Sequence, residues 1–394
     1  MSDAAIQTSW VVLWGVLGAL IGSFANVVVH RWPRGESVVW PRSRCPRCQH
    51  VLGPLELVPI VSWLVLRGRC RDCGGAISMR YPLVEAAMAL GFAVIAWSLP
   101  VTAAGASALP LLVLYAMLLM AALIDLDTYL LPDALTIPAA FVGIAGAFLY
   151  DAQTGLPSPS EALLGAAVGA GVLVLVNRLG GLVLRRFRDT KERLWPISLD
   201  TVNAAALVGA LGGWWAALVA GGAQALASGA VRRPLRLPEP LLYALWLVAL
   251  ILVGSGVAEA WGVGLVAGVT GSVVGAGAFA FVGALWWWLA DWRRSDRRAP
   301  VEESGPPQDD DGEPVAMGFG DVKLAAPLGA MLGWDGFLVG LLIAVVLGAV
   351  VGVAQRAAGG SRFVPFGPFM VVGAFAALLV ADLLLGWYLG LLGV

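Results

Sequence analysis

The feature that most constrains this chain is a series of apolar runs, most of them near the ~20 residues that a helix needs to cross a bilayer. They lie at 9–30, 82–99, 107–124, 134–150, 161–184, 241–257, 263–290, 337–355 and 368–392, with a shorter run at 322–333. Only 13% of the 394 residues are charged, whereas soluble domains carry about 25%. We predict an all-α polytopic membrane protein, a bundle of about ten transmembrane helices in a lipid bilayer, with no nucleic-acid partner.

The distribution of lysine and arginine predicts the orientation of these helices. Basic residues gather at 31–80, 185–193, 232–236 and 293–298, and at Arg356 and Arg362. The positive-inside rule then puts the N-terminus outside and every basic cluster in the cytoplasm. This holds only if the segment from Thr201 to Ala230 begins and ends on the cytoplasmic side. We therefore predict a helical hairpin or re-entrant element that turns near Gly212–Gly213; the alternative is an ordinary span followed by an exceptional loop.

The same patterns divide the chain into seven parts. We expect residues 1–30 to be a retained first transmembrane helix rather than a removed signal peptide. The acidic segment 299–316, rich in proline and glycine, is expected to be a disordered linker. The other parts are a cytoplasmic insert at 31–81, helices with an acidic motif at 82–184, an atypical insertion with the hairpin and an extra span at 185–262, a transmembrane helix at 263–298, and a glycine–aspartate motif with the C-terminal helices at 317–394.

Four cysteines lie in the cytoplasmic insert, in the pairs "CPRC" and "CRDC". Two CxxC pairs on tight turns can close a tetrahedral zinc site with Cys45, Cys48, Cys70 and Cys73 as thiolate ligands. Four thiolates leave no open position, so the zinc would be structural. The alternatives are two disulfides, which a reducing cytosol disfavours, or a redox CxxC, although nothing nearby resembles a thioredoxin unit.

Two acidic motifs are expected at the same face of the membrane. One is "IDLDTYLLPD", where we expect a helix over 107–124 to end at Asp125, a short polar link to follow and Pro132–Asp133 to open the next helix; the other is "MGFGDVK", with Asp321 and Lys323. Two neighbouring carboxylates cannot both ionise cheaply, so one keeps its proton. The ionised carboxylate can deprotonate a water while the protonated one polarises a carbonyl, which is aspartyl-protease chemistry. Gly318 and Gly320 would give a substrate close access to Asp321.

These carboxylates also have simpler interpretations. Asp133, which follows Pro132, is well placed to cap a helix, and Asp127 suits a solvated loop. Asp321 could likewise cap its own helix, and Lys323 could extend its ammonium to the interface or bias the protonation of Asp321. Intramembrane carboxylates also occur in transporters, where they carry protons, and a transporter or assembly scaffold is a further alternative.

The chain resembles the type IV prepilin peptidases, also called leader peptidase/N-methyltransferases. The resemblance covers most of the chain outside about 185–262. It rests on the paired CxxC motifs and on "GSFANVVVHRWP", "LVPIVSWLVLRGRCRDCGGAISMRYPLVE", "IDLDTYLLPD", "MGFGDVKLAAPLGAMLG" and "VPFGPFM". So many motifs in the same order are highly specific.

The resemblance implies an aspartyl protease of the GxGD type in the bacterial inner membrane. Its catalytic pair would be Asp125 and Asp321, with Gly318, Gly320, Lys323, Pro132 and Asp133 in support. Asp125 is preferred to Asp127 because it matches the family's D…PD pattern. The substrates would be type IV prepilins and pseudopilins, whose basic leader is removed after a glycine at the cytoplasmic face.

Bifunctional members then methylate the new N-terminus with S-adenosylmethionine, and the cysteine insert accompanies that activity. A peptidase without methyltransferase activity remains the alternative, because no separate methyl-donor motif is visible. Family members usually have one span between "LLPD" and GxGD, whereas this chain has more, so 161–184 or 263–290 could be its equivalent.

Overall fold

The computed structural model describes residues 3–99, 101–150, 154–183, 196–231, 239–293, 318–359 and 364–392. The predicted linker at 299–316 and most residues of the basic clusters at 185–193, 232–236 and 293–298 lie outside these ranges. The helices are α1 (Asp3–Arg31), α2 (Val61–Val65), α3 (Arg80–Ser98), α4 (Val101–Thr128), α5 (Asp133–Gly146), α6 (Pro159–Val183), α7 (Leu199–Val231), α8 (Glu239–Gly254), α9 (Leu265–Arg293), α10 (Phe319–Ala357) and α11 (Gly367–Leu392).

Short 3₁₀ turns occur at Trp32–Arg34, Pro54–Leu57, Ala147–Leu149 and Val257–Trp261. The described ranges contain no strand longer than an isolated bridge. Within the described residues, seven helices are long and apolar enough to cross a membrane, and three shorter apolar helices lie at Asp133–Leu149, Leu241–Gly254 and Gly367–Ala381. The all-helical prediction is confirmed, and about ten crossing helices stays a prediction.

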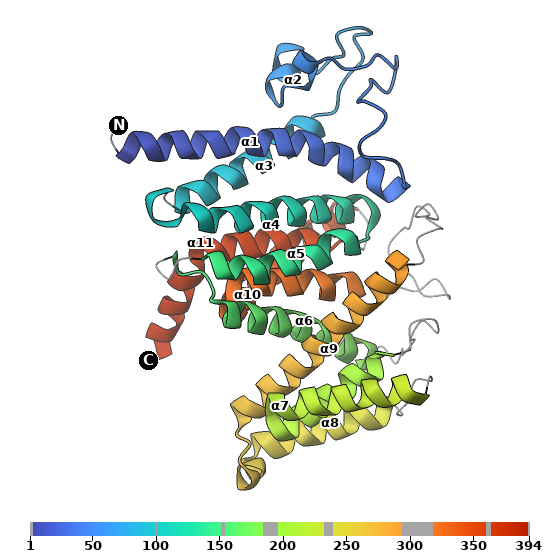
Figure 1. The fold of residues 1–394 in the computed structure, drawn as a ribbon, viewed down its shortest axis with the longest axis vertical. Coiled ribbons are helices and arrows are strands. Elements are labelled where there is room, and N and C mark those ends of the chain that lie inside the picture. The colour runs from blue at the N-terminus through green and yellow to red at the C-terminus, as the bar shows by residue number, and fades with distance from the viewer. Residues whose placement is uncertain are drawn as a thin grey trace.

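The helices form one elongated bundle (Figure 1). The insert with α2 lies at one end of the long axis and α7 with α8 at the other, while α4, α5, α10 and α11 occupy the middle. Small residues let the backbones approach: a Cβ on Gly18 of α1 would lie 2.7 Å from the Met88 carbonyl oxygen of α3. Close packing over small residues is how helices associate in lipid, where hydrophobic burial gives little driving force.

Two of the long helices are broken by a glycine. The backbone of α7 leaves the helical conformation at Gly213 (φ 75°, ψ −175°), and that of α10 does so at Gly333 (φ 74°, ψ 178°). Positive φ with extended ψ is accessible essentially to glycine alone, so these residues permit the chain to turn. We call the segments before the breaks, residues 199–212 and 319–332, the α7 arm and the α10 arm.

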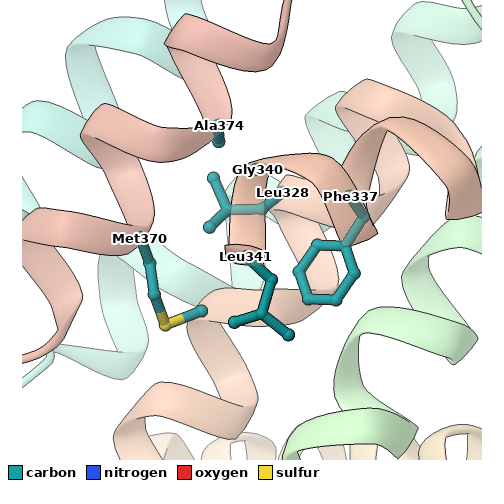
Figure 2. A pocket seen from close by; sticks show the side chains of 6 residues that line it. All are labelled: Leu328, Phe337, Gly340, Leu341, Met370 and Ala374. Atoms are coloured by element: carbon teal, nitrogen blue, oxygen red, sulfur yellow. The ribbon is translucent and has the colours of Figure 1, made fainter. Parts of the chain in front are cut away.

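The two parts of α10 pack together with α11 over apolar side chains. Figure 2 shows Leu328 from the α10 arm facing Phe337 and Leu341 from the second part of α10, with Met370 of α11 beside them. These side chains line a small apolar pocket between the two parts of α10 and α11. The second part of α10 and α11 therefore support the α10 arm. The first turn of this arm lies beside the α4–α5 link.

One local expectation about the polar motif was wrong. The sequence suggested that the helix before "IDLDTYLLPD" ends at Asp125, but α4 continues to Thr128. The Thr128 hydroxyl donates to the Ile124 carbonyl at 2.8 Å, and Asp127 pairs with Arg80 of α3 at 2.5 Å. These contacts stabilise one more helical turn, so Asp125 projects from a helix rather than from a loop.

Candidate active site and cysteine cluster

Asp125 is buried near the C-terminal end of α4, with only 5% of its surface exposed. Its Oδ2 accepts a hydrogen bond of 3.1 Å from the backbone N–H of Gly367, the first residue of α11. A Cβ on residue 367 would lie 2.6 Å from the same oxygen. The glycine in "VPFGPFM" thus lets a helix N-terminus approach the carboxylate and donate to it. A backbone donor carries no side-chain signal, which is why sequence reasoning missed this contact.

Asp321 lies in the first turn of α10, where its backbone N–H donates to the Gly318 carbonyl at 3.3 Å. Leu131 lies between the neighbours of the two aspartates. Its side chain is 3.1 Å from where a Cβ on Gly320, next to Asp321, would stand, and 3.4 Å from where one on Gly367, the donor to Asp125, would stand. The two acidic motifs therefore meet at one place.

The two glycines of the GxGD motif differ in their surroundings. Gly318 precedes α10 in an extended conformation, and a Cβ there would meet nothing closer than 3.9 Å. Gly320 instead lies against Leu131 of the α4–α5 link. Gly320 therefore permits the α4–α5 link and the α10 arm to pack closely.

Lys323, which lies two residues after Asp321, forms an ion pair with Asp133. The distance from Lys323 Nζ to Asp133 Oδ1 is 2.6 Å, and their side chains are 12% and 28% exposed. Pro132 is the N-cap residue of α5, and Asp133 takes the first helical position after it. Of the interpretations available from sequence, Asp133 as a cap is wrong. The ion pair instead fixes the first turn of the α10 arm against the first turn of α5.

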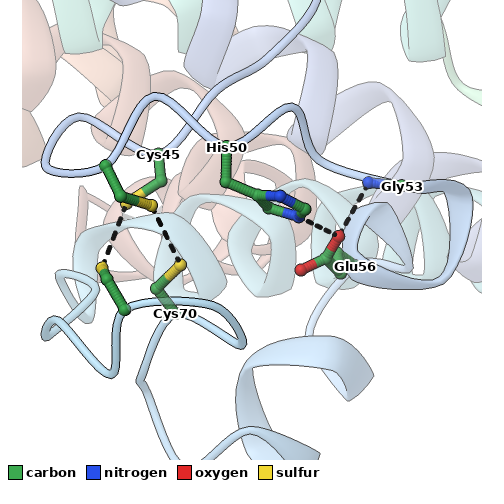
Figure 3. Close-up of polar contacts among 7 residues, drawn as sticks. Cys45, His50, Gly53, Glu56 and Cys70 are labelled. Carbon is green, nitrogen blue, oxygen red and sulfur yellow. Dashed lines mark hydrogen bonds and ion pairs between the residues drawn. The ribbon is translucent and has the colours of Figure 1, made fainter.

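The four cysteines come together as predicted (Figure 3). Their sulfur atoms all lie within 4.8 Å of one another, with Cys45 to Cys73 at 3.9 Å and Cys48 to Cys70 at 4.0 Å. Each CxxC forms a tight turn: Cys45 N–H donates to the His50 carbonyl at 2.9 Å. The second turn repeats this, with Cys70 N–H donating to the Gly75 carbonyl at 2.8 Å.

This geometry fits a zinc ion. Zn–S bonds of about 2.3 Å in a tetrahedron place the sulfurs ~3.8 Å apart, close to the observed separations. The backbone N–H groups of Cys48 and Arg47 donate to the Cys45 sulfur and lower the pKa of this thiol to about 6. A thiol that ionises near neutral pH is a ready metal ligand.

The insert has two anchors that the sequence did not indicate. Glu56 accepts hydrogen bonds from the Gly53 N–H at 2.8 Å and from His50 Nε2 at 3.1 Å, which ties the first cysteine turn to the 3₁₀ turn that follows (Figure 3). These contacts lower the pKa of Glu56. Buried Glu85 of α3 accepts the Ile60 N–H at 2.6 Å and holds the insert to the bundle.

Two family profiles match this chain. The bacterial peptidase A24 N-terminal domain matches residues 16–99, and the type IV leader peptidase family matches two segments, 112–226 and 233–353. The chain belongs to the type IV leader peptidase family. The predicted resemblance is confirmed, and the multi-pass architecture of seven candidate spans agrees with it.

Curated proteins described as prepilin-processing enzymes are similar to parts or most of this chain. A prepilin leader peptidase/N-methyltransferase of Myxococcus xanthus is 44% identical over 175 residues, which is 43% of this chain and 49% of that protein. A type 4 prepilin-like proteins leader peptide-processing enzyme of Escherichia coli is 37% identical over 44% of this chain and 70% of its own. A prepilin leader peptidase/N-methyltransferase of Aeromonas salmonicida is 28% identical over 94% of this chain and 90% of its own. No solved structure matches the chain.

Proposed function

We propose that this protein removes the basic leader of type IV prepilins or pseudopilins, cutting after a glycine at the cytoplasmic face of the inner membrane. The observation that carries the proposal is the packing of the two acidic motifs: Leu131 lies against Gly320, next to Asp321, and against Gly367, whose N–H donates to buried Asp125. Membership of the leader peptidase family supplies the class of substrate. Asp125 and Asp321 are the catalytic pair in this proposal.

The two carboxylates divide the chemistry between them. A site that holds two carboxylates keeps one proton between them, because like charges in a poorly solvated place cannot both ionise. The ionised carboxylate takes a proton from water as the water attacks the scissile carbonyl carbon. The protonated carboxylate donates a hydrogen bond to the carbonyl oxygen and stabilises the charge that develops there.

Support for this division comes from the surroundings of each carboxylate. Asp125 receives the Gly367 N–H, which fixes the direction of its carboxylate. Asp321 follows Gly318, where an added Cβ would meet no described atom closer than 3.9 Å. The pair Lys323–Asp133 keeps the α10 arm in place while the peptide binds. A basic leader stays in the cytoplasm while the apolar helix that follows it lies in lipid, which puts the scissile bond at the membrane face.

Methylation of the new N-terminus with S-adenosylmethionine is the second part of the proposal. It rests on the four-cysteine insert, which accompanies this activity in the family resemblance, and on the relatives described as N-methyltransferases. Zinc held by Cys45, Cys48, Cys70 and Cys73 would keep the insert folded, with no ligand position left for chemistry.

The test uses the full chain in detergent or nanodiscs with a prepilin and a labelled methyl donor. Asp125→Asn and Asp321→Asn should each lower kcat for cleavage at least about 100-fold, because general acid–base catalysis is lost. Retained cleavage in either variant would refute the role of that aspartate. Cleavage by the wild-type protein without transfer of the label would leave a peptidase that does not methylate.

A further inference from the structure

The packing of the helices indicates which of them lies against the GxGD segment. The two sequence candidates, 161–184 and 263–290, are the long helices α6 and α9, and each packs along one of the two broken helices. The helix α6 packs along α10, whereas α9 packs along α7. Each pairing skips the neighbouring helix in sequence, since α6 precedes α7 and α9 precedes α10.

The α7 arm and the α10 arm share a sequence pattern. When Gly213 is placed on Gly333, so that the two backbone breaks coincide, identical residues fall at several positions without a gap. The residues are Ala205 with Ala325, Ala206 with Ala326, Gly209 with Gly329, Ala210 with Ala330 and Trp214 with Trp334. The two breaks also have nearly the same φ and ψ. Composition alone explains an alanine or two, but not a shared break in the same register.

The helices that pack against the two arms, α6 and α9, make equivalent glycine contacts with them. Gly165 of α6 faces Gly329 of the α10 arm, and a Cβ on either would lie 2.0–2.1 Å from the carbonyl oxygen of the other. Gly271 of α9 faces Gly209 of the α7 arm, and the equivalent distances are 2.3 and 2.4 Å. The shift that takes Gly209 to Gly329 is the one that aligns the breaks, so the two contacts are the same contact made twice.

A second contact one turn along repeats the match. A Cβ on Gly169 of α6 would lie 2.4 Å from the Ala325 carbonyl oxygen, and one on Gly275 of α9 would lie 3.0 Å from the Ala205 carbonyl oxygen. One constant shift takes Gly165 and Gly169 to their counterparts in α9. The same shift takes "LPDAL", where α5 begins, to "LPEPL", where α8 begins.

The contact between α6 and α9 is symmetric: the shift that aligns α6 with α9 exchanges the two residue pairs that form it. A Cβ on Gly171 would lie 2.0 Å from the Val273 carbonyl oxygen, and one on Gly277 would lie 1.8 Å from the Ala167 carbonyl oxygen. Exchange of α6 for α9 converts one contact into the other. This reciprocity is the signature of an isologous interface, in which two equivalent units meet about a two-fold axis.

We propose that this chain contains two copies of one helical unit, which have exchanged their arms. The first copy consists of α4, α5, α6 and the α7 arm, and the second of the second part of α7, α8, α9 and the α10 arm. The catalytic arm of the second copy lies on α6 of the first, and the α7 arm has become a non-catalytic brace that holds α6 through α9. The two separate matches of one family profile, at 112–226 and 233–353, support the duplication independently. This inference rests on the proposed function only for the identity of the catalytic residues.

Each copy retains one member of the catalytic pair. In the alignment of the arms, Thr201 stands where the second copy has Asp321, and Asn203 stands in place of Lys323. The shift between the "LP" motifs puts Val231 in the place of Asp125. A site built on the α7 arm would therefore lack both carboxylates, and the active site has to take Asp125 from the first copy and Asp321 from the second.

Matched glycines test this directly. Gly169→Ala would press on the Ala325 carbonyl and displace the arm that carries Asp321, whereas Gly275→Ala would press on α7 at the Ala217 side chain and at the Ala205 carbonyl. We expect Gly169→Ala to lower kcat for leader cleavage at least about tenfold, while Gly275→Ala changes kcat by less than about twofold and lowers the thermal midpoint. Equal loss of kcat in both folded variants, or no loss in Gly169→Ala, would overturn the proposal.

A second experiment covers the case in which either glycine variant fails to fold. Thr201→Ala and Asn203→Ala change the vestigial positions without adding volume, and both should cleave within about twofold of the wild-type rate. A tenfold loss in either, with KM unchanged, would show that the α7 arm takes part in the reaction. Asp321→Asn is measured beside them: if it still cleaves, the proposed catalytic pair fails, whereas the duplication is judged by the other variants.

Discussion

Gly367→Ala should damage catalysis through a single hydrogen bond. The Gly367 N–H donates to Asp125 Oδ2 at 3.1 Å, and a new Cβ would lie 2.6 Å from that oxygen, well inside contact distance. The carboxylate has to turn away or the start of α11 has to shift, and either movement breaks the bond. A hydrogen bond to a charged group contributes about 1.5–3 kcal/mol. If the bond serves the transition state, kcat should fall about 10- to 150-fold.

The assay is steady-state cleavage of a prepilin by the full chain in nanodiscs, with kcat and KM measured separately. Gly386→Ala is the control, because it lies in the same helix and a Cβ there would meet nothing within 4 Å. We expect KM to stay nearly constant in Gly367→Ala and the control to behave as the wild type. Unchanged kcat, or a rise in KM that accounts for the whole loss, would show that Gly367 does not direct Asp125.

Three further predictions concern the surroundings of the site. Asp127→Asn should leave kcat within about twofold, because its pair with Arg80 is largely exposed and such pairs contribute at most about 1 kcal/mol; a loss like that expected for a catalytic residue would contradict the choice of the other aspartate in the motif. Lys323→Met and Asp133→Asn should couple by at least about 1 kcal/mol in a double-mutant cycle of thermal stability, since their ion pair is partly buried; additive effects would argue against the pair. Cys48→Ser should reduce bound zinc from about one equivalent per chain, measured by metal analysis of the purified protein, and spare much of the cleavage; undiminished zinc would place the metal elsewhere.

The sequence predicted most of the helices because their apolar length has one physical explanation. A run of about 20 apolar residues can satisfy its backbone in lipid only as a helix. The spacing of the four cysteines was equally informative, because tight CxxC turns can converge on one point without knowledge of the rest of the fold. Both kinds of signal are local in the chain, and so they can be read without tertiary structure.

The contacts that shape the candidate site depend on tertiary packing instead. Asp125 looked like the end of a helix because polar residues follow it, yet Arg80 of another helix neutralises Asp127 and lets α4 continue. The partner of Lys323 was invisible for a similar reason, since Asp133 stands 190 positions away in sequence. The Gly367 donor is a backbone group, and no residue type announces it.

The duplication also suggests why each copy lost one aspartate. A buried carboxylate pair in a membrane protein carries a cost in desolvation, and a second pair would carry that cost without a second supply of substrate at the same interface. Replacement of the redundant pair by Thr201 and Val231 removes two charges and keeps the frame of small residues that packs the arms. Once one copy had lost its GxGD aspartate and the other its partner, neither copy could act alone. In the proposed exchange of arms, Asp125 comes from the first copy and Asp321 from the second, so leader cleavage would depend on the interface between α6 and α9.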